Sequence, residues 1–353
     1  MFQVHLTDVN AILKDYGFGQ QAERFEELQR YNYEKYDPTS REVRLIIRAD
    51  LENGTSIVIR FKMEDGVTLE LLESQCRFAE LLRANGIPSP EQYRWENGFV
   101  KPYRINGYEV FVCIEEFVEK QIQFVDETIA CKTGALLAKS HNIAENFQAH
   151  VENAVLFDPF GENDLFFADQ FRELCQPLEG KLGTLSRNIL HRYEDYMEVL
   201  APLQKEPKYA VQGDISDCNL YQTSDGSVGV FDFNRCGDNC LFCDAVMQGV
   251  FESRLMNYPE KYGDHQERPI LHAFFKGYQS ARPFSDSQKK MLPYLYTIII
   301  SFWGMDIRWN EDSLENALSR GDMEAVEKWL HVIWQRISQL PTIEALLGDD
   351  TEG

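Results

Sequence analysis

The sequence lacks an apolar run long enough to cross a bilayer, which takes about 20 residues in a helix. The nearest candidate, 292–303, is shorter and contains Pro293 and Ser301, so it predicts a buried helix of a globular protein. The first five residues, Met-Phe-Gln-Val-His, also lack the basic and apolar segments of a secretion signal. We therefore expect a cytoplasmic protein that does not insert into membranes.

Positive charge is scarce as well. The chain has 35 Lys and Arg against 57 Asp and Glu, which gives a net charge of -22. Such a charge repels the phosphates of nucleic acids, so we expect no nucleic-acid partner. The same field would attract a cationic substrate, although solubility alone also accounts for an acidic composition.

Disulfide and metal frameworks are not evident among the 8 cysteines. Cys236, Cys240 and Cys243 have a CxxxCxxC spacing, which is compatible with an iron–sulfur cluster or with zinc. These three residues follow Asp232 closely and precede an apolar helix. That position favours reduced thiols over a metal centre.

A length of 353 residues predicts one large domain or two closely packed lobes. The hydrophobic pattern changes from mostly strand to mostly helix near Glu116. Before this point we expect a helical lead-in over 1–24, strands over 43–47 and 57–61 joined at Asn53-Gly54, a helix over 68–85, and strands over 92–100 and 108–114. After it we expect helices over 127–143, 187–200, 242–257, 267–279, 285–303 and 322–340, interrupted by short strands over 209–211, 220–222 and 228–231.

The segment 209–234 has the spacing of a phosphoryl-transfer site. Asp214 follows a short strand, Asn219 comes five residues later, and Asp232 ends the next strand. Phosphoryl transfer needs a carboxylate that accepts the proton of the attacking hydroxyl, and hard oxygen ligands for magnesium. These three side chains can supply both functions. An Asp-rich turn without chemistry is the alternative interpretation.

The segment Gln212-Gly213-Asp214-Ile215-Ser216-Asp217-Cys218-Asn219, followed by Phe231-Asp232-Phe233-Asn234, resembles the aminoglycoside phosphotransferase, choline kinase and homoserine kinase-like family. The resemblance implies an α+β, protein-kinase-like fold of two lobes. Residues 1–116 would form a nucleotide-binding lobe with an antiparallel sheet and a helix, and 117–353 a mainly helical catalytic and substrate-binding lobe. It also implies ATP and Mg²⁺ as cofactors, Asp214 as catalytic base, and Asn219 and Asp232 as metal ligands.

The chain departs from the family pattern at Gln212, where the family usually has His. Glutamine donates and accepts hydrogen bonds, so we expect support of the loop to persist. Asn234 also replaces the usual second Asp or Gly. His141 lies in a segment that resembles the family's helix before the catalytic loop, where we expect a structural polar contact. Asp244 resembles a helix-start residue that would cap the helix or brace the loop.

The resemblance also places residues that bind the nucleotide. Arg60 and Lys62 occupy the strand that carries the phosphate-gripping basic residue, and we favour Arg60. Glu73 is the leading acidic partner for it, ahead of Glu70. A glycine-rich phosphate loop is missing, so hydroxyls of the 36–41 turn, Ser40 among them, would contact phosphate. Backbone groups near Glu116 and Val118 would pair with adenine in the hinge.

The acceptor substrate is expected to be a hydroxylated small molecule that carries positive charge, such as an amino alcohol or an aminoglycoside-like compound. Aromatic and acidic side chains could line its pocket, since cations bind over Trp rings; core packing is the alternative for these residues. The candidates are Asp164, Phe166, Trp303, Asp306, Arg308, Trp309 and Glu311. A nucleotide-binding pseudokinase without turnover is the alternative function, since Gln212 and the glycine-free loop are unusual.

Overall fold

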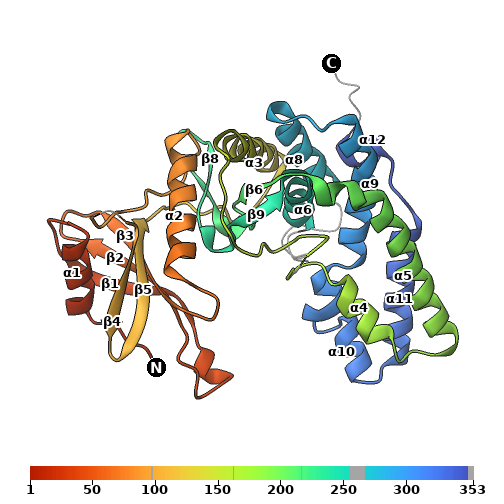
Figure 1. Cartoon of the computed structure of the whole chain (residues 1–353), viewed down its shortest axis with the longest axis horizontal. Helices are drawn as coiled ribbons and strands as arrows, with labels where there is room; N and C mark the ends of the chain where they lie inside the picture. The colour runs from red at the N-terminus through yellow and green to blue at the C-terminus, as the bar shows by residue number, and fades with distance from the viewer. Residues whose placement is uncertain (97, 162, 216, 255–266, 349–353) are drawn as a thin grey trace. The chain divides into compact units, whose positions relative to one another are not determined.

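The computed structural model describes residues 1–96, 98–161, 163–215, 217–254 and 267–348. The chain divides into two compact units (Figure 1). Unit 1 contains Met1–Gln121, Tyr221–Thr223 and Gly229–Phe233, and unit 2 contains the rest. Unit 1 is built on an antiparallel sheet and unit 2 is mainly helical, which confirms the expected α+β class.

The sheet of unit 1 has the strand order β1-β2-β3-β5-β4, with each neighbouring pair antiparallel. In its centre Ile59 pairs with Ile47 on one side and with Ile114 on the other. The strands are β1 Ala22–Tyr31, β2 Val43–Leu51, β3 Ser56–Met63, β4 Val100–Ile105 and β5 Tyr108–Glu116.

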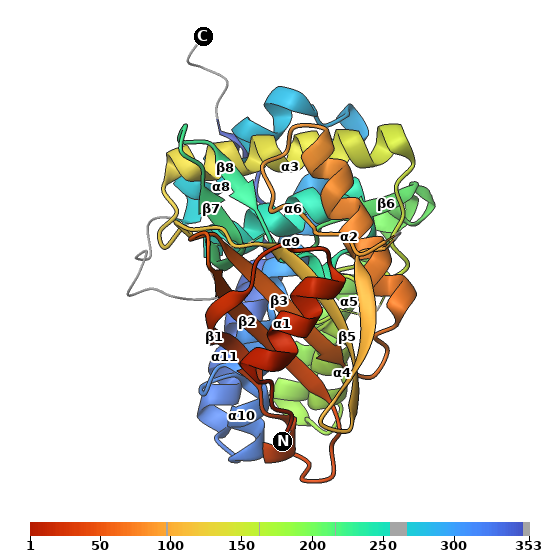
Figure 2. The same ribbon diagram turned by 90° about the vertical axis from the view of Figure 1, so that its left-hand side faces the viewer.

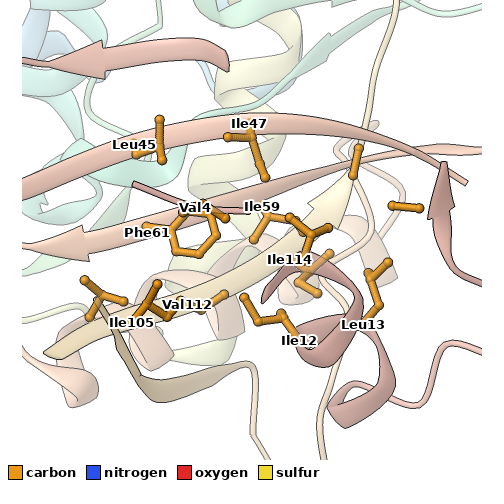
Figure 3. Packing of buried hydrophobic residues seen from close by; sticks show 14 of the residues in the cluster. Val4, Ile12, Leu13, Leu45, Ile47, Ile59, Phe61, Ile105, Val112 and Ile114 are labelled. Atoms are coloured by element: carbon orange, nitrogen blue, oxygen red, sulfur yellow. The ribbon is translucent and has the colours of Figure 1, made fainter. Parts of the chain in front are cut away.

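One face of this sheet is covered by α1, Leu6–Asp15, which lies in front of the strands in Figure 2. Ile12 and Leu13 of this helix point at the sheet residues in Figure 3, and both are fully buried. Alternate β3 residues, such as Ile59, face the same cluster because side chains alternate along a strand. Each buried side chain of this kind stabilises the fold by roughly 1.5–3 kcal/mol.

The helix α2, Leu69–Ala84, belongs to a second hydrophobic cluster of unit 1. Its N-cap is Thr68, whose side chain accepts the N–H of Leu71. Leu72 and Cys76 pack with Cys113, which lies on the face of β5 opposite the α1 cluster. The predicted helix over 68–85 is therefore present, and Thr68 caps its N-terminus.

Two predictions in unit 1, a helical lead-in and a strand, were wrong in part. The lead-in over 1–24 contains α1 but also the start of β1, which is almost wholly exposed at the edge of the sheet. Its charged sequence lacks the alternation that marks a half-buried strand. The strand expected over 92–100 begins only at Val100; before it, Gln92 and Trp95 form isolated bridges. β4 contains Pro102, which an edge strand tolerates.

Unit 2 is organised around α3 and α8, which approach each other backbone to backbone. A Cβ on Gly134 would lie 2.0 Å from the carbonyl oxygen of Phe274, and one on Gly277 only 1.8 Å from that of Cys131. The helices are α3 Glu127–Phe147, α4 Ala168–Cys175, α5 Gly180–Leu200, α6 Leu241–Arg254, α8 Glu267–Ala281, α9 Asp286–Ser301, the π-helix Met305–Trp309, α10 Leu314–Ser319, α11 Met323–Ser338 and α12 Ile343–Leu347.

The predicted short strands are present, and a further strand, β9, was not predicted. Strand β6, Lys208–Val211, pairs with β9, Gly237–Cys240. The sequence did not predict β9, because its residues are mostly polar. β7, Leu220–Gln222, and β8, Val228–Val230, form their own two-stranded ribbon.

Several helices also differ in length or were missed. Helices α4, α10 and α12 were not predicted, because so few turns show little periodicity. Helix α5 starts at Gly180, earlier than the expected Arg187. The expected end of α6 at 255–257 lies outside the described residues. Among the helices that the structure describes, none is long and apolar enough to span a membrane.

Candidate functional site

The loop that follows β6 turns sharply at Gly213. This residue has φ +80°, and a Cβ there would lie 2.6 Å from the carbonyl oxygen of Arg235. Both the backbone conformation and the close approach therefore require glycine. Asp214 comes directly after this turn, so the backbone of the loop sets the direction of its side chain.

Asp214 and Asn219 are bound to each other within this loop. Asn219 Nδ2 donates to the carbonyl oxygen of Asp214 at 2.8 Å and to its carboxylate Oδ2 at 3.0 Å. Asn219 is buried and Asp214 half-buried. The nitrogen side of the amide is thus directed to Asp214, and Oδ1 is the hard oxygen that a magnesium ion prefers. Ser216, between the two, lies outside the described residues.

Two glutamine side chains hold consecutive N–H groups of the loop. Gln212 Oε1 accepts the N–H of Asp214 at 2.8 Å, and Gln248 Oε1 accepts the N–H of Ile215 at 2.9 Å. The expected support of the loop by Gln212 is therefore visible as a hydrogen bond to the backbone of Asp214.

His141 and Asp244 lie in a buried hydrogen-bonded chain below the loop. His141 Nε2 meets Asp244 Oδ2 at 3.0 Å, and its Nδ1 meets the Tyr278 hydroxyl at 2.8 Å. Asp244 Oδ1 accepts from Gln248 Nε2 at 3.2 Å. His141 thus has the structural contact that we expected. Asp244 lies inside the first turn of α6 and contacts the loop through Gln248.

Asp232 belongs to unit 1 and has an unusual backbone. Its φ of 58° lies in the left-handed region, which costs energy for most residues other than glycine and is tolerated by Asp. Its Oδ1 lies 3.5 Å from Arg60 NH1. Such local strain is common at functional sites.

Arg60 is buried and forms a tight ion pair with Glu115 of β5. Its Nε and NH2 donate to Glu115 Oε1 at 2.8 and 2.6 Å, and Gln92 Nε2 donates to Glu115 Oε2 at 2.9 Å. Burial opposes the guanidinium charge, but Glu115 and Asp232 offset this effect, so the pKa of Arg60 is raised above its usual value. The arginine is therefore a fixed cation on the face of β3 opposite α1.

The expected pairing of Arg60 with Glu73 was wrong. Glu73 Oε1 accepts the N–H groups of Phe99 and Val100, each at 2.7 Å, and its Oε2 lies 3.7 Å from Arg77. Glu73 thus fixes the start of β4. The register that sets Arg60 opposite Cys113 brings Glu115, two residues further on the same face, within reach of the guanidinium.

Lys62 lies on the same face of β3 as Arg60, as the two-residue spacing predicted. It is also buried. Burial, followed by the neighbouring charge of Arg60, lowers the pKa of Lys62 below its usual value. A second buried cation therefore lies two residues after Arg60.

The remaining nucleotide candidates of unit 1 have ordinary local contacts. Ser40 Oγ accepts the N–H of Glu42 at 3.2 Å, in the connection from β1 to β2. Glu116 ends β5 and its N–H donates to the carbonyl oxygen of Glu91 at 2.8 Å. Val118 is half-buried just beyond this strand.

Three of the acceptor candidates are packed in the interior of unit 2. Trp303 is 1% exposed, and Phe166 and Asp306 are buried as well. Phe166 and Trp303 form a backbone bridge, and Asp306 Oδ2 binds Arg336 at 2.6 Å. For these residues the core-packing alternative holds.

The other acceptor candidates are accessible. Asp164, about half exposed, pairs with Arg235 at 3.0 Å, and Arg308 pairs with Glu315 at 3.2 Å. Trp309 is 42% exposed and its ring lies edge-on to Phe167. Because the backbone of Arg235 packs on Gly213, Asp164 is connected to the loop of Asp214 through this arginine.

The cysteines of the CxxxCxxC segment are buried free thiols. Burial raises the pKa of Cys236 well above its usual value. The hydrogen bond with Cys240, followed by burial, does the same to the pKa of Cys243. In the part of the chain that the structure describes, no group of three or more His, Cys, Asp or Glu side chains is arranged to hold a metal ion.

Glu115 and Gln248 are the residues that sequence reasoning missed. Glu115 carried a signal, because it is an acidic residue at the end of the apolar run Val110–Ile114 and shares a strand face with Cys113. Gln248 carried no comparable signal, since α6 is buried on all sides and its contact to Ile215 depends on tertiary packing.

Comparison with known proteins is consistent with this geometry. The model of the APH phosphotransferase enzyme family matches residues 44–284, which include β3, the loop of Asp214 and all of α8. No curated protein sequence matches the chain.

Three solved structures with the same fold cover between 83% and 96% of this chain. The amicoumacin kinase hAmiN, in complex with AMP-PNP, Ca²⁺ and Ami, has a TM-score of 0.57 and 15% identity, over 83% of this chain and 86% of that one. A microcompartment-associated aminopropanol kinase has a TM-score of 0.57 and 13% identity, over 95% and 96%. An aminoglycoside phosphotransferase from Alicyclobacillus acidocaldarius has 0.53 and 12%, over 96% and 98%. These likenesses show the fold.

Proposed function

Because the chain belongs to the APH phosphotransferase enzyme family and is a small-molecule kinase, we propose that it transfers the γ-phosphate of ATP to a hydroxyl of an amine-bearing acceptor. The observation that carries the proposal is the loop of Asp214. Its carboxylate is oriented by Asn219, and its backbone is held by Gln212 and Gln248. Phosphoryl transfer depends on such positioning more than on covalent chemistry by the protein.

In this proposal Asp214 orients the acceptor and receives its hydroxyl proton. The proton moves from the acceptor oxygen to the carboxylate as the oxygen attacks the γ-phosphorus, and ADP leaves. The hydrogen bond from Asn219 Nδ2 to Oδ2 sets the plane of the carboxylate. A group oriented in advance loses less entropy at the transition state.

Asn219 and Asp232 are the proposed ligands of Mg²⁺, by their match to the family's sequence pattern. Both offer hard oxygen atoms, and the Asn219 amide already directs its nitrogen toward Asp214, so the donor set fits this ion. When bound, Mg²⁺ would neutralise charge on the nucleotide phosphates. Asp232 is also near a fixed cation, Arg60, at 3.5 Å.

We assign the phosphate-binding cation to Arg60, which Glu115 holds in one orientation. Glu115 is thus the acidic partner that orients Arg60, a role that we expected for Glu73 from the sequence. Backbone groups near Glu116 and Val118 are proposed to bind the adenine edge, and Ser40 lies in the turn proposed to contact phosphate. A kinase that uses ATP is expected in the cytoplasm, where ATP is abundant.

The acceptor is proposed to be an amino alcohol or an aminoglycoside-like compound. The net charge of -22 favours the approach of a cation. Asp164 supplies an accessible carboxylate that is connected to the catalytic loop through Arg235. The names of two proteins with the same fold, an aminopropanol kinase and an aminoglycoside phosphotransferase, fit this class.

The proposed role of Asp214 is tested with Asp214→Asn. We expect kcat to fall by roughly 10²- to 10⁴-fold, because the proton acceptor is lost. The Kd for Mg-ATP, measured by calorimetry, should stay within about 3-fold, since the amide keeps the size of the side chain. Unchanged turnover in the Asn variant would remove Asp214 from the catalytic role.

The acceptor class is tested by a screen of hydroxylated compounds with purified enzyme and ATP, scored by ADP release and by mass of the product. Amino alcohols and aminoglycosides should be phosphorylated, and their hydroxyl analogues without the amine should react poorly. Turnover of a neutral sugar or nucleoside, with no cationic alcohol accepted, would contradict the proposed class.

A further inference from the structure

A glutamine of α6 binds the backbone next to the catalytic aspartate. Gln248 is 3% exposed; its Oε1 accepts the N–H of Ile215 at 2.9 Å and its Nε2 donates to Asp244 Oδ1 at 3.2 Å. A peptide N–H only donates and a carboxylate only accepts, so the two contacts determine which way the amide faces. Gln248 is therefore held at both ends.

The contact continues into the interior of unit 2. Asp244 Oδ2 meets His141 Nε2 at 3.0 Å, and His141 Nδ1 meets the Tyr278 hydroxyl at 2.8 Å. Burial raises the pKa of Tyr278, so this group remains a neutral phenol. The chain of contacts joins α3, α6 and α8 to the loop, and each of its side chains is buried. Buried polar networks of this kind are rigid when every member is satisfied.

We propose that Gln248 is a positioning residue for phosphoryl transfer: it fixes the N–H of Ile215 and thereby orients the carboxylate of Asp214. The inference rests on the proposed function, because it takes Asp214 as the proton acceptor. Gln212 holds the preceding N–H, that of Asp214 itself. Two neutral amides thus support consecutive peptide groups, and neither support changes with pH.

A carboxylic acid at position 248 would behave differently. Asp244 on α6 contacts this position directly, and His141 on α3 and Tyr278 on α8 follow it in the hydrogen-bonded chain. Besides burial, the charge of Asp244 contributes to the raised pKa of Cys236, which precedes β9. Asp214 comes directly before Ile215, whose N–H Gln248 accepts. A carboxylate introduced there would lie beside that of Asp244, and two carboxylates this close hold one proton between them. With that proton the acid reproduces both contacts of the glutamine. Without it, the donor to Asp244 is lost and the two charges repel each other.

The first test replaces the amide with an apolar side chain of similar length. We expect Gln248→Met to lower kcat by about 10- to 100-fold, because small displacements of a catalytic group are costly. The KM for ATP should stay within about 3-fold. Thr133→Val, which removes a buried hydroxyl that donates within α3, is the matched control and should keep its kcat. All assays are run well below the melting temperature of each variant.

The second test uses Gln248→Glu as a conservative variant. Its kcat should approach that of the wild type at the acid end of the accessible pH range and fall as the pH rises and the shared proton is lost. The folded fraction, followed by circular dichroism at each pH, should stay constant over this range. A pH profile of the Glu variant parallel to that of the wild type would overturn the positioning role.

Hydrogen exchange gives a readout that needs no acceptor. The amide of Ile215 should exchange at least about 10-fold faster in Gln248→Met than in the wild type, while amides of α3 and α9 keep their rates. Faster exchange at Ile215 with unchanged kcat would overturn the proposal and leave the role of Asp214 intact. If no acceptor is turned over by the wild type, the proposed function fails, and exchange still reports whether Gln248 holds the loop.

Discussion

Two buried cations on one strand illustrate how much a residue's function depends on its neighbours. Arg60 and Lys62 share a face of β3, but Arg60 is fixed by Glu115 and Asp232. The pKa of Lys62 is lowered by burial and by the charge of Arg60. The arginine is therefore the better oriented of the two for binding phosphate, because its guanidinium is already held in place.

We predict that Arg60→Lys raises the KM for ATP by about 10-fold, since a lysine cannot bind Glu115 through two nitrogens. Lys62→Met should leave this KM within about 3-fold. Steady-state kinetics with varied ATP at saturating acceptor measures both. The opposite order of effects would assign the phosphate contact to Lys62.

Lys62→Met should also stabilise the protein at neutral pH. Because burial lowers the pKa of Lys62 in the folded chain, the charged ammonium destabilises the folded state at neutral pH. This penalty declines as the pH rises from the lowered pKa toward the unfolded value of about 10.4. The stability gain of the variant, measured by denaturant unfolding, should therefore be largest at neutral pH and shrink in alkaline buffer.

At the level of elements, the loop after β6 depends on one glycine. Gly213 combines a positive φ with the carbonyl oxygen of Arg235 2.6 Å from the point where a Cβ would lie. Gly226, in the turn between β7 and β8, has nearly the same φ, +81°, but no atom within 4 Å of the point where a Cβ would lie. An alanine at Gly226 would therefore suffer from backbone strain alone, whereas an alanine at Gly213 would also collide with a neighbouring atom.

We predict that Gly213→Ala lowers kcat by more than about 10-fold, because the loop must move away from Arg235 and carries Asp214 with it. Gly226→Ala should lose about 1 kcal/mol of stability from its φ alone and keep its kcat. The kcat and the melting temperature of both variants, measured side by side, test this prediction. Equal activity of the two variants would show that the close approach at Gly213 is not needed for catalysis.

The crossing of α3 and α8 is a second element-level constraint. A Cβ at Gly277 would collide with the backbone of Cys131 at 1.8 Å. We expect Gly277→Ala to destabilise unit 2 by about 2–3 kcal/mol, since two packed backbones cannot separate without opening voids. Lys276→Ala, at an exposed neighbouring position, should have little effect on the melting temperature.

At the level of the whole molecule, the acidic composition should act on substrate binding through long-range attraction. We predict that the KM of a cationic acceptor rises when NaCl is increased from about 0.05 to 0.5 M, because the Debye length shortens from more than 10 Å to a few ångströms. The KM of a neutral acceptor with the same hydroxyl group should change much less. Equal salt dependence of both acceptors would show that the net charge of -22 serves solubility alone.

The sequence alone was enough to predict the fold class, the main helices and the loop with Asp214 and Asn219. Helix periodicity and turn residues are local signals, so α2 and α3 were visible in the sequence. The edge strand β1 was not, because an exposed strand needs no apolar alternation. Strand β9 was missed for a similar reason, since its residues are polar and its pairing with β6 joins segments about 30 residues apart.

What only tertiary structure decided is which side chains meet. The acidic partner of Arg60 follows from the register between β3 and β5, and a strand face offers several acidic candidates until that register is known. The contact of Gln248 with Ile215 likewise depends on how α6 packs below the loop. Spacing along the chain was enough to bring Asp214 and Asn219 together, because their loop is short. The partners of Arg60 and Gln248 were determined by packing, because the local sequence does not indicate which distant elements contact each other.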